Sequence, residues 1–348
     1  MKPYGSKNVN GLMLPSHFWF TSKQLPGAVR IWIALTGLTV TFLASSQSFD
    51  KRTRETYAAN RISNQVTWDY IYTGNKPSER GIKTSVTQYT PQGDVAQVTA
   101  YNPKGQVINI EKYRYDSHGN RTEYSRYQGE GQSQAAYQKL SKYNDNNLLV
   151  EESGYDGVEN FMNLYKYDVR GEMTEIRYMK KNVLNEKRTF TRDGNITLVS
   201  IYNQSGSLLS KLVLKYDAAK NLTEESVYGM NQGELEKKTY NYDKNRNLKE
   251  ETKFMLDKIT LKTIYNYNAS GDLLDISEES PGNARFIKKS FTYGPKGNLL
   301  DIKWRRKGNE EFNSITYSYD AKGICTTADT WYPATKYRVL TKYKYDLF

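Results

Sequence analysis

A tyrosine-containing turn motif recurs along most of this 348-residue chain. Its last five copies begin at Tyr242, Tyr267, Tyr293, Tyr319 and Tyr345, which are 25, 26, 26 and 26 residues apart. The copies that precede Tyr242 are spaced at about half of that period or at the full period. Self-similarity at a fixed period of this length is the signature of a repeat protein. The chain is therefore expected to fold as a series of similar units.

The residues of the motif predict a β-hairpin turn. In YDSHGN (115–120) and YDAKGI (319–324), Asp follows the tyrosine and Gly comes three positions after the Asp. The Asp side chain can accept a hydrogen bond from the backbone two residues on, and Gly supplies the positive φ of a type I turn with a G1 bulge. Lys220 and Arg246 occupy this Gly position, where a left-handed conformation costs about 1–2 kcal/mol. Those two turns are expected to be wider or strained.

The stretches between the turns are rich in β-branched and aromatic residues and lack a helical period. Each period then supplies two antiparallel strands of roughly eight or nine residues, and residues 86–348 supply on the order of twenty strands. A flat sheet of that width is unfavourable because sheets twist. The predicted fold is all-β, a repeat protein of consecutive antiparallel hairpins that form a long, coiled or partly rolled meander sheet. Its tyrosines are expected to form the core on the concave side.

The pattern Y-D-x-x-G-N-L with an upstream Y-x-Y resembles the YD (RHS-type) repeat family, and it covers the chain from about residue 86 to the end. For large members the resemblance implies spiral β shells that enclose a toxin or present glycan-binding surfaces. This chain is short, lacks the core motif that ends such shells, and stops at YKYDLF, so toxin delivery is not expected. In size, leader and repeat content it is similar to small exported YD-repeat proteins, such as the plug-type accessory of the type IX secretion translocon.

The first 46 residues are predicted to be a signal peptide or leader. Arg30 precedes an apolar run from Ile31 to Ala44, which has the length of a secretory h-region and is short for a membrane span. Cleavage is expected near Ser46, and an uncleaved anchor is the alternative. An exported chain that cannot form an internal disulfide fits a bacterial envelope. The expected location is the periplasm, the outer membrane or the cell surface, with no integral span after leader removal.

Two further regions follow the leader. Residues 47–85 are predicted to be an N-terminal arm with the first strands, and residues 86–348 the YD-repeat β domain. Within the first region, VTWDYIYTGN reads as a strand that leads into a turn, whereas RTRETYAANRISNQ is either a short helix or an extended arm.

Few side chains in the chain can carry chemistry. After leader removal one histidine remains, His118, in a turn, and Cys325 has no adjacent base and is expected to be a small filler. Neither a catalytic triad nor a histidine metal site can be assembled from these residues. The turn aspartates lack the dense acidic spacing of calcium loops. We therefore predict no catalytic, cofactor or metal site, and a chain that is not an enzyme.

Acidic runs recur after the turns, as EES at 151–153 and 224–226 and ISEES at 276–280. Two carboxylates suffice for a glycosidase, which makes a carboxylate-only glycosidase the least favoured alternative. Recurrence at equivalent strand positions favours a solvated strand face. The net charge of +12 is spread over interleaved signs, which argues against nucleic acid as a partner.

Three tryptophans, Trp68, Trp304 and Trp331, interrupt the tyrosine pattern and are the predicted binding contacts. The favoured function is a non-enzymatic exported envelope protein whose repeat sheet binds another protein, such as an outer-membrane secretion channel. The alternative is a periplasmic or cell-surface glycan-binding module that uses tyrosine and tryptophan platforms.

Overall fold

One antiparallel sheet contains most of the residues that the computed structural model describes, which are 42–231 and 233–348. Strands make up 63% of the structure. The elements are α1 (Phe42–Ala59), β1 (Ile62–Thr73), β2 (Lys76–Pro77), β3 (Ile82–Tyr89), β4 (Val95–Tyr101), β5 (Val107–Tyr115), β6 (Arg121–Tyr127), β7 (Tyr137–Tyr143), β8 (Leu149–Tyr155), β9 (Asn160–Tyr167), β10 (Met173–Lys180), β11 (Val183–Asp193), β12 (Ile196–Asn203), β13 (Leu208–Tyr216), β14 (Leu222–Tyr228), β15 (Glu234–Tyr242), β16 (Leu248–Met255), β17 (Lys258–Tyr267), β18 (Leu273–Ser280), β19 (Asn283–Tyr293), β20 (Leu299–Trp304), β21 (Asn313–Tyr319), β22 (Cys325–Tyr332), the 3-10 helix η1 (Pro333–Thr335) and β23 (Tyr337–Leu347).

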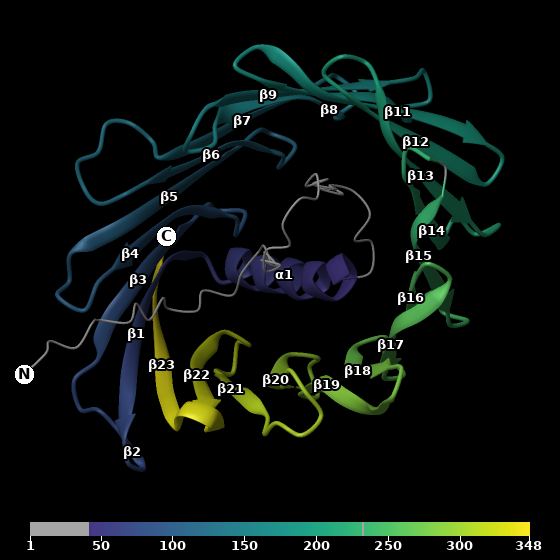
Figure 1. Ribbon diagram of the computed structural model, residues 1–348. Helices are drawn as coiled ribbons and strands as arrows, with labels where there is room; N and C mark the ends of the chain where they lie inside the picture. The colour runs from purple at the N-terminus through teal and green to yellow at the C-terminus, as the bar shows by residue number, and fades with distance from the viewer. Residues whose placement is uncertain (1–41, 232) are drawn as a thin grey trace, which may run out of the picture. The chain divides into compact units, whose positions relative to one another are not determined.

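The sheet closes on itself. From β3 to β23 each strand pairs with the next one in the sequence, and β1 pairs with β3 on one side and with β23 on the other. The result is a closed antiparallel barrel of 22 strands (Figure 1). The all-β prediction is confirmed, but the predicted coiled or partly rolled sheet is wrong. Closure satisfies the two rows of backbone groups that the edges of an open meander would leave unpaired.

The turns that follow the motif tyrosines at the ends of the odd-numbered strands β3 to β9 and β13 to β21 gather at one end of the barrel, which we call the helix end. Helix α1 lies against these turns and within the ring of strands in Figure 1. The guanidinium of Arg54 is 3.1 Å from the Asp94 carboxylate, and Arg52 donates a hydrogen bond to the Gly297 carbonyl. Residues 52–59 of the segment predicted as helix or arm are therefore helical, whereas its last residues, from Ile62, belong to β1. The copies of the motif at Tyr101 and Tyr202 form turns at the opposite end.

The turns have the predicted chemistry. The Asp116 carboxylate accepts hydrogen bonds from the amides of His118 and Asn120, both at 2.9 Å, and Gly119 has a φ of +82°. Lys220 and Arg246 both have a φ of +66°, so the predicted left-handed conformation is confirmed. Their turns are as narrow as the glycine turns, because the same backbone hydrogen bond closes each of them, so of the two predicted alternatives the strained turn is found and the wider turn is not.

Eight of the motif tyrosines tie their hairpins to the preceding ones. The Tyr242 hydroxyl donates to the Leu222 carbonyl at 2.8 Å, and the Tyr267 hydroxyl donates to the Leu248 carbonyl at 3.0 Å. Both acceptors are the first strand residue after the previous helix-end turn. The same bond recurs at Tyr115, Tyr143, Tyr167, Tyr293, Tyr319 and Tyr345. We call this series the tyrosine ladder.

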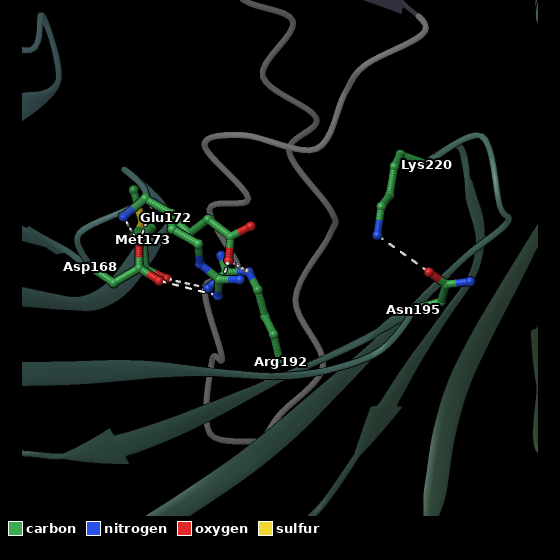
Figure 2. A network of polar contacts seen from close by, with 7 residues as sticks. Asp168, Glu172, Met173, Arg192, Asn195 and Lys220 are labelled. Atoms are coloured by element: carbon green, nitrogen blue, oxygen red, sulfur yellow. Dashed lines mark hydrogen bonds and ion pairs between the residues drawn. The ribbon is translucent and has the colours of Figure 1, made fainter.

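One repeat replaces the tyrosine of the ladder with arginine. Arg192 stands before Asp193 and donates to the Met173 carbonyl at 2.7 Å, so the guanidinium occupies the place of the phenol (Figure 2). Its Nε also lies 3.5 Å from the Glu172 carboxylate. In the neighbouring turn Arg170 is within 3.5 Å of Asp168 and 3.2 Å of Glu172. The ladder therefore continues through this repeat with a charged donor.

The ladder tyrosines lie on the lumenal face of the barrel. Tyr57 of α1 contacts the rings of Tyr89 and Tyr345, with ring centroids 5.0 and 5.7 Å apart, and α1 lies inside the ring of strands. On the same face leucines after the turns pack beneath the tyrosines, as Leu248 and Leu273 do beside Tyr265. The predicted tyrosine core is thus shared with aliphatic residues.

The outward face carries a series of ion pairs and no tyrosine ladder. The residue before several ladder tyrosines is a cation, and the residue directly across the hairpin is a glutamate. The pairs are Arg114–Glu123 at 3.4 Å, Lys142–Glu151 at 2.9 Å, Lys166–Glu175 at 3.1 Å and Lys215–Glu224 at 2.7 Å. The two faces of the barrel wall therefore differ in chemistry.

The contact between α1 and the turns yields a matched test. A Cβ on Gly93 would overlap the Arg54 carbonyl oxygen of α1, whereas a Cβ on Gly105 meets no atom within 4 Å. Both glycines have a positive φ, so Gly105→Ala should lower the free energy of unfolding by about 1–2 kcal/mol through backbone strain alone. Gly93→Ala should lower it further, as measured by chemical denaturation. Equal losses in the two variants would contradict the docking of α1 on this turn.

Candidate functional site

The three predicted tryptophan contacts do not lie together. Trp68 on β1 and Trp331 on β22 share the outward face, with β23 between them, because Trp68 is opposite Lys342 and Trp331 is opposite Arg338. Trp304 on β20 faces the lumen. All three side chains are half-buried. Two of the three residues therefore share a face, and their role as binding contacts stays a prediction.

Trp304 is a packing residue. It lies against the lumenal cluster formed by Leu299, Ile302 and Tyr317, and its ring meets the ring of Tyr332 edge-on at 5.9 Å. Edge-to-face packing of this kind stabilises aromatic pairs in protein cores. The lumenal position of Trp304 corrects its prediction as an exposed contact.

Trp68 and Trp331 border an aromatic surface at the seam where the first and last strands meet. The Lys342 ammonium lies 4.5 Å from the centre of the Tyr70 ring, and the Arg338 guanidinium lies 4.4 Å from the centre of the Tyr72 ring. Cations over aromatic faces attract the ring quadrupole. We call the half-exposed and exposed side chains of this surface the seam patch: Trp68, Tyr70, Tyr72, Trp331, Arg338 and Lys342.

The arginine of the seam patch is held in place. Arg338 makes two hydrogen bonds with the Asp329 carboxylate, at 2.9 and 2.7 Å, and Asp329 also accepts a bond from the Tyr72 hydroxyl at 3.2 Å. The hydrogen bond to Asp329 raises the pKa of Arg338 above its ordinary value. A bidentate pair of this kind fixes the guanidinium plane and leaves its face over Tyr72. This half of the patch is thus preorganised.

The patch extends onto β3. Gly81 packs so closely on the Tyr70 ring that a Cβ there would lie 2.7 Å from the phenol Cζ. The Lys83 ammonium lies 3.7 Å from the centre of the Tyr101 ring. Around the aromatic centre the outward cations Lys83, Lys342 and Arg338 outnumber the carboxylate of Asp329. The surface around the aromatic centre therefore carries a positive charge.

The sequence reasoning missed the tyrosines and cations of the seam patch. Tyr70 and Tyr72 stand in the same segment as Trp68, at alternate positions of one strand, which places all three on one face. The sequence therefore indicated that these three side chains share a face. It could not indicate the contribution of β22 and β23, because that contribution depends on the pairing of the two ends of the domain.

The recurring EES runs divide between the two faces. Glu151 and Glu224 face outward with lysines, as predicted for a solvated face. Glu225 is 5% exposed on the lumenal face, where it accepts a hydrogen bond from the Tyr240 hydroxyl at 3.2 Å. Glu152 is bound there by Lys139 at 2.6 Å and by the Tyr165 hydroxyl at 2.7 Å. The prediction of a solvated face is wrong for Glu152 and Glu225, the second glutamates of the two EES runs.

The pKa shifts of the lumenal carboxylates have different causes. Burial is the largest single influence on Glu152 and tends to raise its pKa, but the hydrogen bond and charge of Lys139, together with hydrogen bonds from Tyr165 and Asn163, hold the pKa below its ordinary value. At Glu251 burial dominates and raises the pKa. Lysine and tyrosine side chains bind the carboxylates of Glu152 and Glu225, which gives both glutamates a structural role in the barrel wall.

The other residues considered for chemistry are dispersed. His118 is exposed at a turn, and Cys325 is half-buried beside the ladder, where its thiol lies 3.5 Å from the Thr327 carbonyl. Across residues 42–231 and 233–348, no group of three or more His, Cys, Asp and Glu side chains could hold a metal ion. In the same part of the chain, no helix is long and apolar enough to cross a membrane.

Comparisons with known proteins find low similarity. No protein-family model and no curated protein matches the chain. Among solved structures, TcdB2-TccC3-Cdc42 is 12% identical with a TM-score of 0.26, over 81% of this chain and 19% of that one. A porin-like protein from Bacteroides uniformis is 12% identical with a TM-score of 0.31, over 82% and 97%. The chain thus spans about a fifth of the TcdB2-TccC3 chain, and TM-scores this low support no inference about function.

The thiol of Cys325 offers a test of the site chemistry. Burial raises its pKa to about 12, so at about pH 8 only ~10⁻⁴ of the molecules carry the reactive thiolate. A thiol reagent such as Ellman's reagent should label the native protein at least 100-fold more slowly than the protein in denaturing guanidinium chloride. Fast labelling of the native protein would show an accessible, activated thiol and would contradict its role as a filler.

Proposed function

We propose that this chain is a non-enzymatic, exported bacterial envelope protein whose barrel binds another protein through the seam patch. An accessory or plug of an outer-membrane secretion channel is the partner relationship that we favour. The predicted leader and the repeat pattern support this proposal, and the seam patch is the surface that would bind the partner.

The composition and geometry of the seam patch carry this proposal. Tryptophan, tyrosine and arginine are the residues that supply most of the energy of protein–protein interfaces. Here Trp68, Trp331, Tyr70 and Tyr72 lie half-exposed on one face, and Asp329 holds Arg338 against a ring. Side chains that are already ordered lose little entropy when a partner binds. The surrounding cations would steer and orient a partner with acidic side chains.

The outward ion pairs support a barrel that works in water. Pairs such as Lys142–Glu151 and Lys215–Glu224 are spread along the outer face of consecutive hairpins. A membrane-spanning barrel instead presents an apolar band to lipid, because charged side chains at the bilayer centre are unfavourable. We therefore place the protein in the periplasm or at the cell surface, in contact with a membrane protein and not within the bilayer.

The rival functions make other demands on the structure. A carboxylate-only glycosidase requires two carboxylates free to act on substrate, whereas Glu152 and Glu225 are each bound by tyrosine. A glycan platform built from Trp304 and Trp331 together is not supported, since the two rings lie on opposite faces of the wall. Protein binding requires only the outward surface.

A comparison of two outward tyrosines tests the proposal. Tyr70 lies under Lys342 in the seam patch, and Tyr202 lies under Lys187 at 4.9 Å on a distant strand. Tagged wild-type protein and variants are used to capture partners from gently solubilised envelopes, and captured proteins are quantified by mass spectrometry. Tyr70→Ala and Trp331→Ala should each reduce recovery of an envelope channel by about tenfold or more, the loss expected at interface hot spots. Tyr202→Ala should not.

Two results would contradict the proposal. One is equal recovery of partners by Tyr202→Ala and the seam variants. The other is recovery of the wild-type protein alone. Circular dichroism of each variant shows whether a loss reflects binding or unfolding.

A further inference from the structure

Large apolar side chains are exposed on three neighbouring hairpins at the end of the barrel opposite the helix end. The hairpins are β14–β15, β16–β17 and β18–β19, which follow one another in the sheet (Figure 1). We call these side chains the apolar tips: Met230 at 70% exposure, Leu235 at 46%, Met255 at 49%, Leu256 at 70%, Ile259 at 46% and Ile287 at 42%. Among the other described hairpins of this end, β4–β5, β8–β9 and β10–β11 expose one large apolar side chain each.

The turn at the centre of the apolar tips is strained. Leu256 and Asp257 form a two-residue turn between β16 and β17, with φ angles of +48° and +61°. Two positive values define a type I′ turn, which glycine and asparagine adopt readily and leucine does not. The turn of Lys181 and Asn182 between β10 and β11 has φ angles of +48° and +62° but carries polar side chains. Leu256 is therefore unfavourable both for the backbone and for hydration, which points to a role outside folding.

The tips are separate projections. A hollow of about 510 Å³ is lined by Ile259 of β16–β17, by the turn Pro281–Ala284 of β18–β19, and by Lys262 and Glu279. Lys262 and Glu279 are opposite each other in the register of the sheet, so their charges offset each other. The surface of these hairpins is thus indented, with room for small molecular groups between the projecting side chains.

Cations border the apolar tips. Lys258 follows the strained turn, Arg285 follows the turn of β18–β19, and both side chains are exposed. Within residues 42–231 and 233–348, neither of them forms an ion pair with a carboxylate. The Asp257 carboxylate lies 3.6 Å from the Lys237 ammonium, which balances its charge. The two cations at the tips can therefore meet an anionic surface.

Apolar projections bordered by cations fit an anionic lipid surface. Apolar side chains gain free energy when they enter the boundary between headgroups and acyl chains, and lysine and arginine attract anionic headgroups. Lipid headgroups are small and mobile, so they can fill the space between separate projections. The tips consist of leucine, isoleucine and methionine, whereas the hot spots of protein interfaces are enriched in tryptophan, tyrosine and arginine. A membrane thus fits these hairpins better than a second protein does.

We propose that the apolar tips insert into the surface of an anionic membrane, with Lys258 and Arg285 at the lipid headgroups. Only the hairpin turns enter the interface, and the ion pairs of the outer wall remain in water. The seam patch lies on β1, β22 and β23 and is a separate surface. Loss of lipid binding and loss of a protein partner are therefore distinguishable outcomes.

Partition of the full-length chain onto lipid vesicles tests the proposal. The probes are vesicles of equal parts phosphatidylglycerol and phosphatidylcholine, and neutral vesicles of phosphatidylcholine, with bound protein measured by flotation. Leu256→Asn should lower the partition coefficient on the anionic vesicles at least tenfold, because a leucine side chain no longer enters the lipid. The double variant Lys258→Gln/Arg285→Gln should lose the preference for anionic over neutral vesicles.

Lys181→Asn is the matched control, because it places the same new residue in a turn of the same conformation. It should change the partition coefficient less than twofold. Leu256→Asn should also raise the melting temperature, since asparagine tolerates the left-handed conformation. A loss of lipid binding in a more stable variant cannot result from unfolding.

A fluorescent label locates the inserted segment independently of the leader. The variant Cys325→Ala/Leu256→Cys is labelled with an environment-sensitive dye, and its emission should shift to shorter wavelengths on anionic vesicles. The same dye on Cys325→Ala/Lys181→Cys should not shift.

Several results would overturn the proposal. They are an unchanged emission at position 256, the absence of wild-type binding to anionic vesicles, and an equal loss of binding in Leu256→Asn and Lys181→Asn. Another is a Leu256→Asn variant that binds vesicles as the wild type does but no longer captures an envelope protein. That result would assign the apolar tips to a protein partner.

Discussion

Pairing between the first and last strands determines what the rest of this molecule can be. Residues from Ile62 to Ile71 of β1 lie in register with residues from Leu347 back to Val339 of β23. Without this pairing the meander has two faces and two free edges. With it, the tyrosine face becomes a lumen that receives α1, and the charged face becomes the outer wall. The same pairing brings Tyr70 beside Lys342 and creates the seam patch from the two ends of the domain.

The tyrosine ladder repeats a second interaction around the wall. Each hydroxyl reaches the carbonyl after the previous turn, as Tyr293 does to Leu273 at 3.1 Å. A hydrogen bond of this kind contributes about 1 kcal/mol net, so the packing of each ring over the leucines beneath it is at least as important. Where Arg192 replaces the tyrosine, the bond to the carbonyl is kept. At this position the hydrogen-bond donor is retained without the aromatic ring.

Local features of this fold could be predicted from the sequence, and long-range features could not. The Asx turns, the hairpins and the positive φ of Lys220 and Arg246 follow from residues within a few positions of one another. Closure depends on contacts between strands at the two ends of the domain, which carry no local signal. For the same reason the sequence could not show that Trp68 and Trp331 share the outward face or that Trp304 packs on the lumenal face. The burial of Glu225 was missed because alternate residues of an EES run face opposite sides of the wall.

The measurement that tests this account most directly is a cross-link across the closing seam. Val66 and Lys344 are directly opposite each other on β1 and β23, on the outward face. With Cys325 replaced by alanine and cysteines at positions 66 and 344, a short bismaleimide should join the two ends of a single monomer. Cysteines at positions 66 and 303, which lie on non-adjacent strands, should not be joined. An intramolecular link at 66 and 344 is the result that a closed barrel predicts. Links that form only between two copies, or do not form at all, would contradict closure, and with it the lumen and the seam patch.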